Sequence, residues 1–130
     1  MNKLLQLKDG TCRTALVTGA AGGIGSATAK ALSNHGAKVM VTDVNEAALS
    51  ALVDEIRAEG GEAMAAALDV GDPESWQQAR QQVFDSWGPL SILVNNAGID
   101  VVKSVADTSL ADWDRLFRVN STGMFLGTQC

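Results

Sequence analysis

Short apolar segments alternate along this chain with longer segments of helical periodicity, and this alternation constrains the fold more than any other feature. The expected strands are residues 13–17, 38–42, 63–68 and 91–94, and the expected helices are residues 24–35, 46–59, 73–87 and 110–130. Strands that alternate with helices predict a parallel sheet that is covered by helices on both faces. Because strand–helix–strand crossovers are right-handed, the strand order 3-2-1-4 is favoured.

Residues with known capping roles stand at the expected helix starts. Asn45 can cap the second helix, and Asp72 before Pro73 is typical of a helix start. Ser109 and Asp112 have the spacing of a capping box at the start of the last helix. These helices therefore have local start signals as well as apolar stripes.

The helical spacing also predicts which helix faces are buried. The residues at this spacing are Ile24, Ala27, Ala31 and His35 in the first helix, and Trp113, Leu116, Phe117, Asn120 and Met124 in the last. Since a helix of a globular protein buries its stripe, we expect these faces to pack against the sheet or against a partner.

The fourth strand and the last helix indicate an incomplete domain. Residues 91–94 read SILV, a continuously apolar run typical of a strand covered on both faces, yet the expected order leaves this strand at an edge. The last three residues of the last helix, Thr128-Gln129-Cys130, include neither a C-cap residue nor a proline. We therefore expect an α/β fold, a Rossmann-like doubly wound parallel sheet truncated after the fourth strand and the following helix. Residues 1–130 would form a single domain that a continuation or a partner completes.

The composition excludes several classes of protein. With 46% hydrophobic and 19% charged residues, the chain can bury a core and is unlike a disordered segment. A net charge of −5 without a basic cluster disfavours binding to nucleic acid or to an anionic membrane. No run approaches the roughly 18 apolar residues of a membrane-spanning helix. Cys12 and Cys130 do not make a disulfide framework, so we expect a reduced, cytoplasmic protein, and we expect no metal site.

A glycine-rich turn at residues 18–25 joins the first strand to the first helix. Glycines there permit a tight turn and let the backbone approach a phosphate, while the helix N-terminus offers free N–H groups. The alternative is a merely flexible turn. The turn lacks the Gly-Lys-Ser/Thr ending of a P-loop, which disfavours a nucleoside triphosphatase.

An acidic residue, Asp43, follows Gly19 by 24 positions at the end of the second strand. Near this spacing, a dinucleotide-binding fold places a carboxylate on the adenosine ribose hydroxyls. Such a carboxylate accepts hydrogen bonds from both hydroxyls and repels a 2′-phosphate. Neither the glycine turn nor the segment from Val44 to Glu46 holds a basic residue, which favours NAD over NADP. The alternative is that Asp43 caps the next helix together with Asn45.

Polar residues also follow the third and fourth strands. Asp69 and Val70 come after the third strand, and Asn-Asn-Ala-Gly occupies 95–98 after the fourth. The carboxyl ends of parallel strands face the ligand crevice, so Asp69 could accept a hydrogen bond from an adenine amino group. Cap and turn roles are the alternatives for both segments. Asn120 is either a structural hydrogen-bond former or part of a site, because a buried amide needs partners.

In this order, the motifs resemble the short-chain dehydrogenase/reductase family over residues 13–130. The resemblance rests on Thr-Gly-x-x-x-Gly-x-Gly at 18–25, the acid at 43, Asp-Val at 69–70, Asn-Asn-Ala-Gly at 95–98 and the asparagine at 120. It implies a dinucleotide site formed by Gly19, Gly23, Ile24, Gly25, Asp43, Val44, Asp69, Val70, Asn96, Ala97 and Gly98. It also implies that Asn120 is the catalytic asparagine, which helps to hold a water in a proton relay.

The resemblance further implies hydride transfer between a nicotinamide and an alcohol or carbonyl carbon of a small molecule. In the family, the tyrosine of a Tyr-x-x-x-Lys pair is the acid/base, and a serine orients the substrate oxygen. This sequence has no tyrosine and no serine that matches that position. A catalytically silent NAD-binding or interaction module, or a truncated gene product, is therefore the alternative to an oxidoreductase.

Association is a further expectation. The matching last helix of the family contributes to a dimer or tetramer interface. Here Trp113, Phe117, Met124, Phe125 and Leu126 cover more than one helix face, which fits burial on two sides. We therefore expect a homo-oligomer.

Overall fold

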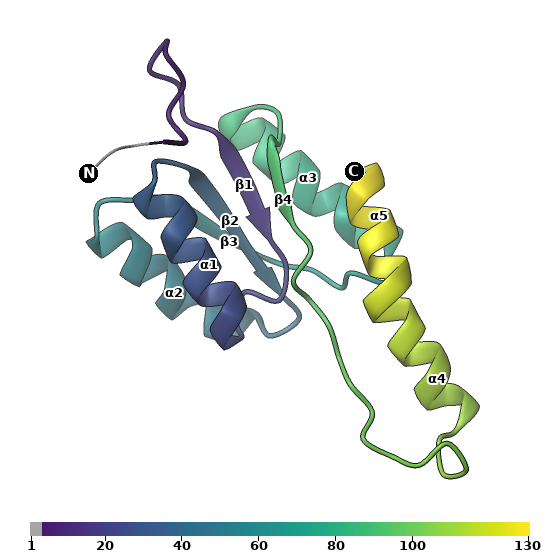
Figure 1. Ribbon diagram of the computed structural model, residues 1–130. Coiled ribbons are helices and arrows are strands. Elements are labelled where there is room, and N and C mark those ends of the chain that lie inside the picture. Colours follow the sequence, from purple (N-terminus) through teal and green to yellow (C-terminus); the bar gives the residue numbers. More distant parts are fainter. Residues whose placement is uncertain (1–3) are drawn as a thin grey trace.

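The computed structural model describes residues 4–130 as one parallel sheet with flanking helices (Figure 1). The strands are β1 Thr14–Val17, β2 Lys38–Asp43, β3 Glu62–Ala67 and β4 Ile92–Val94. The helices are α1 Gly23–Asn34, α2 Glu46–Ala58, α3 Pro73–Trp87, α4 Leu110–Phe117 and α5 Gly123–Gln129, with a π-helical turn, η1 Arg118–Thr122, between the last two. The predicted alternation is confirmed, and each strand boundary lies within one residue of its expected place.

The strands pair in the order β3-β2-β1-β4, and every pairing is parallel, as the sequence predicts. Val17 of β1 is in register with Val41 of β2 and with Val94 of β4. Asp43 is in register with Ala67 at the ends of β2 and β3. The segments that follow the strands therefore leave the sheet at one edge, the lower edge in Figure 1.

Alternate strand residues feed two apolar cores, because successive side chains point to opposite faces of a sheet. One core joins Val17, Val39 and Val41 to residues of α1 and α2, including Ala29 and Leu49. The other core joins Leu16 and Met40 to Trp76 and Val83 of α3, with Leu126 of α5 packed against it. Figure 1 shows α1 and α2 to the left of the strands and α3 and α5 to the right.

The capping predictions hold at two of three helix starts. The Asp72 carboxylate accepts a hydrogen bond from the Glu74 backbone N–H at 3.1 Å, and Pro73 follows in the first turn. The Ser109 hydroxyl accepts from the Asp112 N–H, also at 3.1 Å. Asn45 occupies the cap position of α2 but makes no side-chain capping bond.

The predicted buried face of α1 is wrong. Ile24 is 77% exposed, and Ala27, Ala31 and His35 are exposed as well. The buried residues of α1 are Gly25 and Ala29. The glycine turn places the start of α1 close to the strands, so only its smallest residues fit between the helix and the sheet. The sequence prediction was based on the spacing of larger side chains and therefore selected another face.

The last helix also differs from the prediction of one continuous helix over 110–130. The turn η1 interrupts it, and each π-type turn contains more residues than an α-helical turn. Residues on either side therefore no longer share a face at the spacing that the sequence analysis assumed. Of the predicted stripe, Leu116 and Asn120 are half-buried, whereas Trp113, Phe117 and Met124 are exposed.

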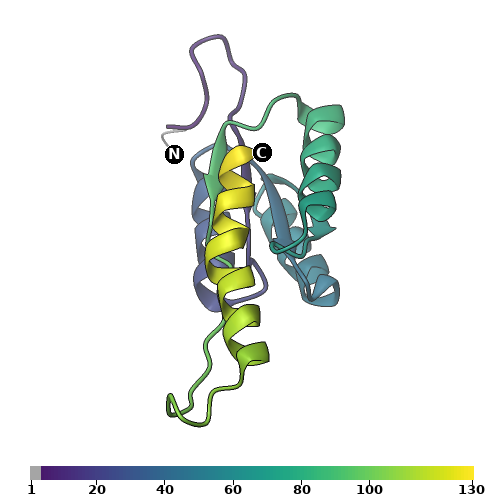
Figure 2. The same ribbon diagram turned by 90° about the vertical axis from the view of Figure 1, so that its right-hand side faces the viewer.

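Two glycines bring α5 against the rest of the molecule. A Cβ on Gly123 would lie 2.7 Å from Val70 Cγ2, and one on Gly127 would lie 2.6 Å from Trp76 Cη2. Figure 2 shows α5 alongside the sheet and α4 continuing past its lower edge. The contact of this helical segment thus depends on small residues and leaves aromatic ones outside.

Strand β4 lies at the sheet edge, and within residues 4–130 it pairs with β1 alone. Ile92 packs against one core and Leu93 against the other, yet all three residues of the strand are only half-buried.

None of the helices within residues 4–130 has the length and apolarity needed to cross a membrane.

Candidate functional site

The glycine turn between β1 and α1 packs directly against the segment that follows β4. Gly19 has a φ of +64°, and a Cβ there would lie 2.9 Å from the Ala97 Cα. A Cβ on Gly25 would lie 2.7 Å from Asn96 Nδ2 and would collide with the Gly19 carbonyl oxygen. Left-handed backbone at the first position and lack of space at both require glycine.

Hydrogen bonds between Thr18 and the segment after β4 fix this contact. The Thr18 hydroxyl accepts from the N–H groups of Asn96 at 3.0 Å and Ala97 at 2.9 Å, and it donates to the Val94 carbonyl at 3.3 Å. The Asn96 side chain donates to the carbonyl oxygens of Thr18 and Gly19, at 3.0 and 3.2 Å. The Asn96 amide thus supports the turn from behind.

Asp43 lies at the carboxyl end of β2 and is held by two backbone groups. One carboxylate oxygen accepts from the Ala21 N–H at 3.1 Å, and the other accepts from the Asn45 N–H at 3.0 Å. The first bond ties Asp43 to the glycine turn, and the second places it at the start of α2. The contacts of Asp43 are therefore compatible with both hypotheses, a carboxylate that binds the cofactor and a cap for α2.

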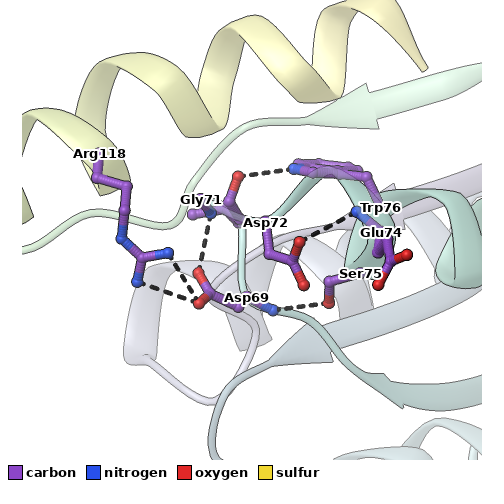
Figure 3. Close-up of polar contacts among 8 residues, drawn as sticks. Asp69, Gly71, Asp72, Glu74, Ser75, Trp76 and Arg118 are labelled. Carbon is purple, nitrogen blue, oxygen red and sulfur yellow. Dashed lines mark hydrogen bonds and ion pairs between the residues drawn. The ribbon is translucent and has the colours of Figure 1, made fainter.

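Asp69 stands after β3 in a network that Figure 3 shows. One of its carboxylate oxygens accepts from the Gly71 N–H at 2.9 Å, and the other accepts from Nη1 and Nη2 of Arg118, both at 3.1 Å. Val70, the next residue, accepts at its carbonyl a 2.8 Å hydrogen bond from the buried indole N–H of Trp76. The loop after β3 is thus tied to α3 and to η1.

Asn120 lies in the middle of η1, and its amide bonds reciprocally to one backbone residue. Its Oδ1 accepts from the Ile99 N–H at 2.8 Å, and its Nδ2 donates to the Ile99 carbonyl at 2.7 Å. Asn120 therefore holds the segment after β4 against the last helix. This arrangement satisfies the half-buried amide that the sequence analysis singled out.

A pocket of about 150 Å³ opens at the carboxyl edge of the sheet among these segments. Seven of the predicted cofactor residues line it: Gly19, Asp43, Val44, Asp69, Val70, Ala97 and Gly98. Leu68, Ile99 and Val119 complete the lining. The remaining predicted residues, Gly23, Ile24, Gly25, Asn96 and Asn120, lie outside this lining.

The start of α1 adds a different kind of surface beside this edge of the sheet (Figure 1). Gly23 and Ile24 are exposed, and the first N–H groups of a helix have no partners within the helix. The cap residue, Gly22, has no side chain to bond them. Because helix N-termini also carry partial positive charge, this end of α1 can bind an anionic group.

Sequence reasoning missed Thr18, Ile99 and Arg118 as individual contributors. Thr18 is the first residue of the recognised glycine motif, and Ile99 directly follows Asn-Asn-Ala-Gly, so their positions were a usable signal. Arg118 is separated from its partner Asp69 by 49 residues, and no spacing rule connects the two.

The parallel sheet has the strand order β3-β2-β1-β4, and a glycine-rich turn leads from β1 into α1. These features define a Rossmann-like α/β domain. The family model described as short chain dehydrogenase matches residues 13–130. The chain therefore belongs to the short-chain dehydrogenase family, a family of oxidoreductases.

Curated relatives resemble the chain over most of its length. The 2,5-dichloro-2,5-cyclohexadiene-1,4-diol dehydrogenase LinX of Sphingobium indicum is 41% identical over 115 residues, which cover 88% of this chain and 46% of that protein. Cyclopentanol dehydrogenase of Comamonas sp. is 41% identical over 117 residues, which cover 90% of this chain and 47% of the relative. The chain thus spans less than half the length of these two relatives.

Solved structures of the family match the fold closely. A short-chain type dehydrogenase/reductase from Mycobacterium marinum superimposes with a TM-score of 0.89 at 35% identity, over 99% of this chain and 52% of that one. A short chain dehydrogenase/reductase from Burkholderia phymatum, solved in complex with NAD, gives a TM-score of 0.88 at 32% identity, over 92% and 42% of the two chains.

Proposed function

We propose that this chain forms the NAD(H)-binding part of a short-chain dehydrogenase. The carboxylate of Asp43 carries the proposal, because it lies in the pocket wall with its direction fixed by the N–H groups of Ala21 and Asn45. A carboxylate has about four lone-pair sites, so acceptors remain for the two hydroxyls of an adenosine ribose. No basic residue at 18–25 or 44–46 would neutralise a 2′-phosphate, which favours NAD over NADP.

The other predicted residues would extend the binding site on both sides of Asp43. The start of α1, with Gly23 and Ile24, suits the cofactor pyrophosphate, because its N–H groups attract anions. Asp69 and Val70 would contact the adenine, and the small Ala97 and Gly98 would leave room for the nicotinamide-side ribose. In this proposal Val44 lines the adenosine end, whereas Gly25 and Asn96 act from behind by shaping the turn.

The nicotinamide of the bound cofactor supplies the hydride chemistry, with an alcohol or carbonyl compound as the small-molecule substrate. The residues of this chain bind and orient the cofactor. Asn120 holds the Ile99 backbone beside the pocket, and by its likeness to the family asparagine it would help to hold a water in a proton relay. Since the sequence has no tyrosine, the acid/base would be supplied by residues other than these 130.

Calorimetric titration with NAD and NADP tests the cofactor proposal. We expect saturable binding with a preference for NAD. Substitution of Asp43→Ala removes two charge-assisted hydrogen bonds to the ribose, so NAD should bind at least about tenfold more weakly while NADP loses less. Asp54→Ala, which removes an exposed carboxylate from α2, is the matched control. An unchanged NAD-to-NADP ratio in Asp43→Ala contradicts the assignment.

Turnover distinguishes an enzyme part from a silent module. The absence of tyrosine favours cofactor binding without turnover by the 130-residue chain alone. We expect no oxidation of cyclopentanol with NAD until the segment of a relative that bears Ser and Tyr-x-x-x-Lys is joined to the chain. Turnover without that segment refutes the division of roles, and its persistent absence with the segment present supports the silent module. A truncated, poorly folded product would instead expose apolar surface and show no saturable NAD binding.

We also propose that the protein is a cytoplasmic homo-oligomer. Trp113, Phe117, Met124 and Phe125 are exposed on the last helices, and the rings of Trp113 and Phe117 stack at 4.6 Å. An exposed aromatic cluster of this kind is typical of an association surface. Light scattering coupled to size-exclusion chromatography should give a mass larger than 13.6 kDa, and Phe117→Ser should lower it.

A further inference from the structure

The sequence analysis assigns no role to Arg118, yet its side chain binds Asp69, which lines the pocket. Its guanidinium donates from Nη1 and Nη2 to the same oxygen of Asp69, each at 3.1 Å, as Figure 3 shows. The other Asp69 oxygen accepts from the Gly71 N–H at 2.9 Å. The carboxylate is therefore fixed from two sides, by its own loop and by the last helical segment.

The loop after β3 is shaped to accept this arginine. A Cβ on Gly71 would lie 2.7 Å from both Cγ and Nη1 of Arg118. The Gly71 backbone does not lie in the left-handed region, so the side chain of Arg118, not backbone strain, requires a glycine there. A methyl group at this position would displace the arginine without changing any charge.

The π-helical turn that carries Arg118 makes two more contacts with the pocket. Val119 lines it, and Asn120 holds Ile99, another lining residue, through its two hydrogen bonds. Three consecutive residues thus contact the loop after β3, the interior of the pocket and the segment after β4. Single π-type turns of this kind are frequent at functional sites.

We propose that Arg118 is a positioning residue that couples the adenine side of the cofactor site to Asn120. By holding Asp69, it keeps the loop after β3 and the Asn120–Ile99 pair in one relative arrangement. The assignment of adenine to the Asp69 side rests on the proposed NAD function. The side chains of Arg118 and Asp69 are 49% and 40% exposed, so the ion pair is weak and sensitive to salt. Its effect is therefore local positioning more than global stability.

Amide hydrogen exchange of the ligand-free chain tests the coupling directly. Arg118→Ala and Gly71→Ala should both speed exchange at the Ile99 amide by about threefold to fivefold, the range of a partly exposed ion pair. Arg118→Lys should restore part of the protection, and 1 M salt should bring the wild-type chain toward Arg118→Ala. Arg115→Ala, which removes an exposed arginine from the neighbouring α4, is the control and should leave Ile99 unchanged. Unchanged exchange at Ile99, or an equal rise at all amides, overturns the proposal.

Adenosine monophosphate extends the test to the cofactor site, because it lacks the nicotinamide-side half of the dinucleotide. It should slow exchange at Ile99 more strongly in the wild-type chain and in Arg115→Ala than in Arg118→Ala. Equal protection of Ile99 by the nucleotide in all three chains overturns the coupling. If the wild-type chain binds neither NAD nor adenosine monophosphate, the proposed function fails, and the ligand-free exchange comparison still decides the role of Arg118.

Discussion

Glycines are required in two regions of the molecule, for different reasons. One region is the glycine turn where it contacts the segment after β4, and the other is the last helical segment, residues 110–129. In the turn, Gly19 and Gly25 are required because backbone and amide atoms leave no room for a Cβ. In the helical segment, Gly123 and Gly127 are required because side chains from the loop after β3 and from α3 press on them. The first region is therefore closed by its own backbone, whereas the second is held by a narrow strip of small residues.

The tryptophans repeat this contrast. Trp76 on α3 is 2% exposed, and Trp113 on α4 is 56% exposed. The difference teaches that stability is concentrated around the sheet and the turn, while the last helical segment keeps its aromatic surface outside. Substitutions around the sheet should change folding, and substitutions on the helical segment should change association or positioning.

The largest expected effect separates the two tryptophans. Trp76→Ala removes a buried ring and the 2.8 Å hydrogen bond to the Val70 carbonyl, so the free energy of unfolding should fall by about 3–5 kcal/mol. Trp113→Ala should change the free energy of unfolding of the monomer by no more than about 0.5 kcal/mol. Urea denaturation at low protein concentration measures both. Equal losses would show that the helical segment is part of the same core.

The next effect concerns two neighbouring glycines at the start of α1. A Cβ on Gly25 would meet Asn96 Nδ2 at 2.7 Å, whereas a Cβ on Gly23 meets nothing within 4 Å. Gly25→Ala should therefore destabilise the chain by about 1–3 kcal/mol through overpacking, and Gly23→Ala should be close to neutral. Thermal unfolding of the two variants side by side measures this. A neutral Gly25→Ala would mean that the turn can move away from β4.

The contrast between the regions also explains what the sequence could predict. The sheet, its order and the segments that form the pocket depend on local patterns: apolar runs, glycine at a strand-to-helix turn, and polar residues at strand ends. The residues at these ends come together because parallel strands finish at one edge, which the register of Val17, Val41 and Val94 shows. These features follow from local sequence, so they were predictable.

Contacts between distant segments were not predictable in the same way. The buried face of α1 depends on how closely the glycine turn brings the helix to the sheet, which hydrophobic periodicity does not measure. The π-type turn at Arg118–Thr122 shifts the register of the last helix, and neither helical periodicity nor residue propensity specifies a turn of this type. The ion pair of Arg118 with Asp69 depends on that same turn. Each failure therefore arises from tertiary packing that overrides a local rule.

A smaller effect is expected from one hydroxyl in each region. Thr18 is 1% exposed, and its hydroxyl makes hydrogen bonds with the backbone of Val94, Asn96 and Ala97. Thr18→Val leaves the Ala97 N–H without an acceptor, whereas the Asn96 N–H keeps its bond to the Val94 carbonyl at 3.0 Å, so the free energy of unfolding should fall by about 1–2 kcal/mol. Thr128→Val on α5 removes only a bond to the Met124 carbonyl on an exposed helix face, so its loss should be at most about 0.5 kcal/mol. Similar losses in a urea series would contradict the view that polar stabilisation is concentrated at the turn.

The smallest effect is a pH dependence confined to the start of α4. The hydrogen bond from Lys103, at 2.6 Å, and then the contact with Ser109 lower the pKa of Asp112 from its ordinary value of 3.8. The folded pKa is thus below the unfolded one, so the stabilisation is present above about pH 4 and is lost as the pH falls through the folded pKa.

Asp112→Asn lacks this contribution, so the difference in unfolding free energy between it and the wild-type chain should shrink on acidification. Asp114→Asn, which removes an exposed carboxylate from the same helix, is the matched control. Because Asp112 and Lys103 lie at the surface, high salt should reduce the difference as well. Persistence of the full difference at pH 2 would mean that the substitution acts through the cap at Ser109, not through the charge.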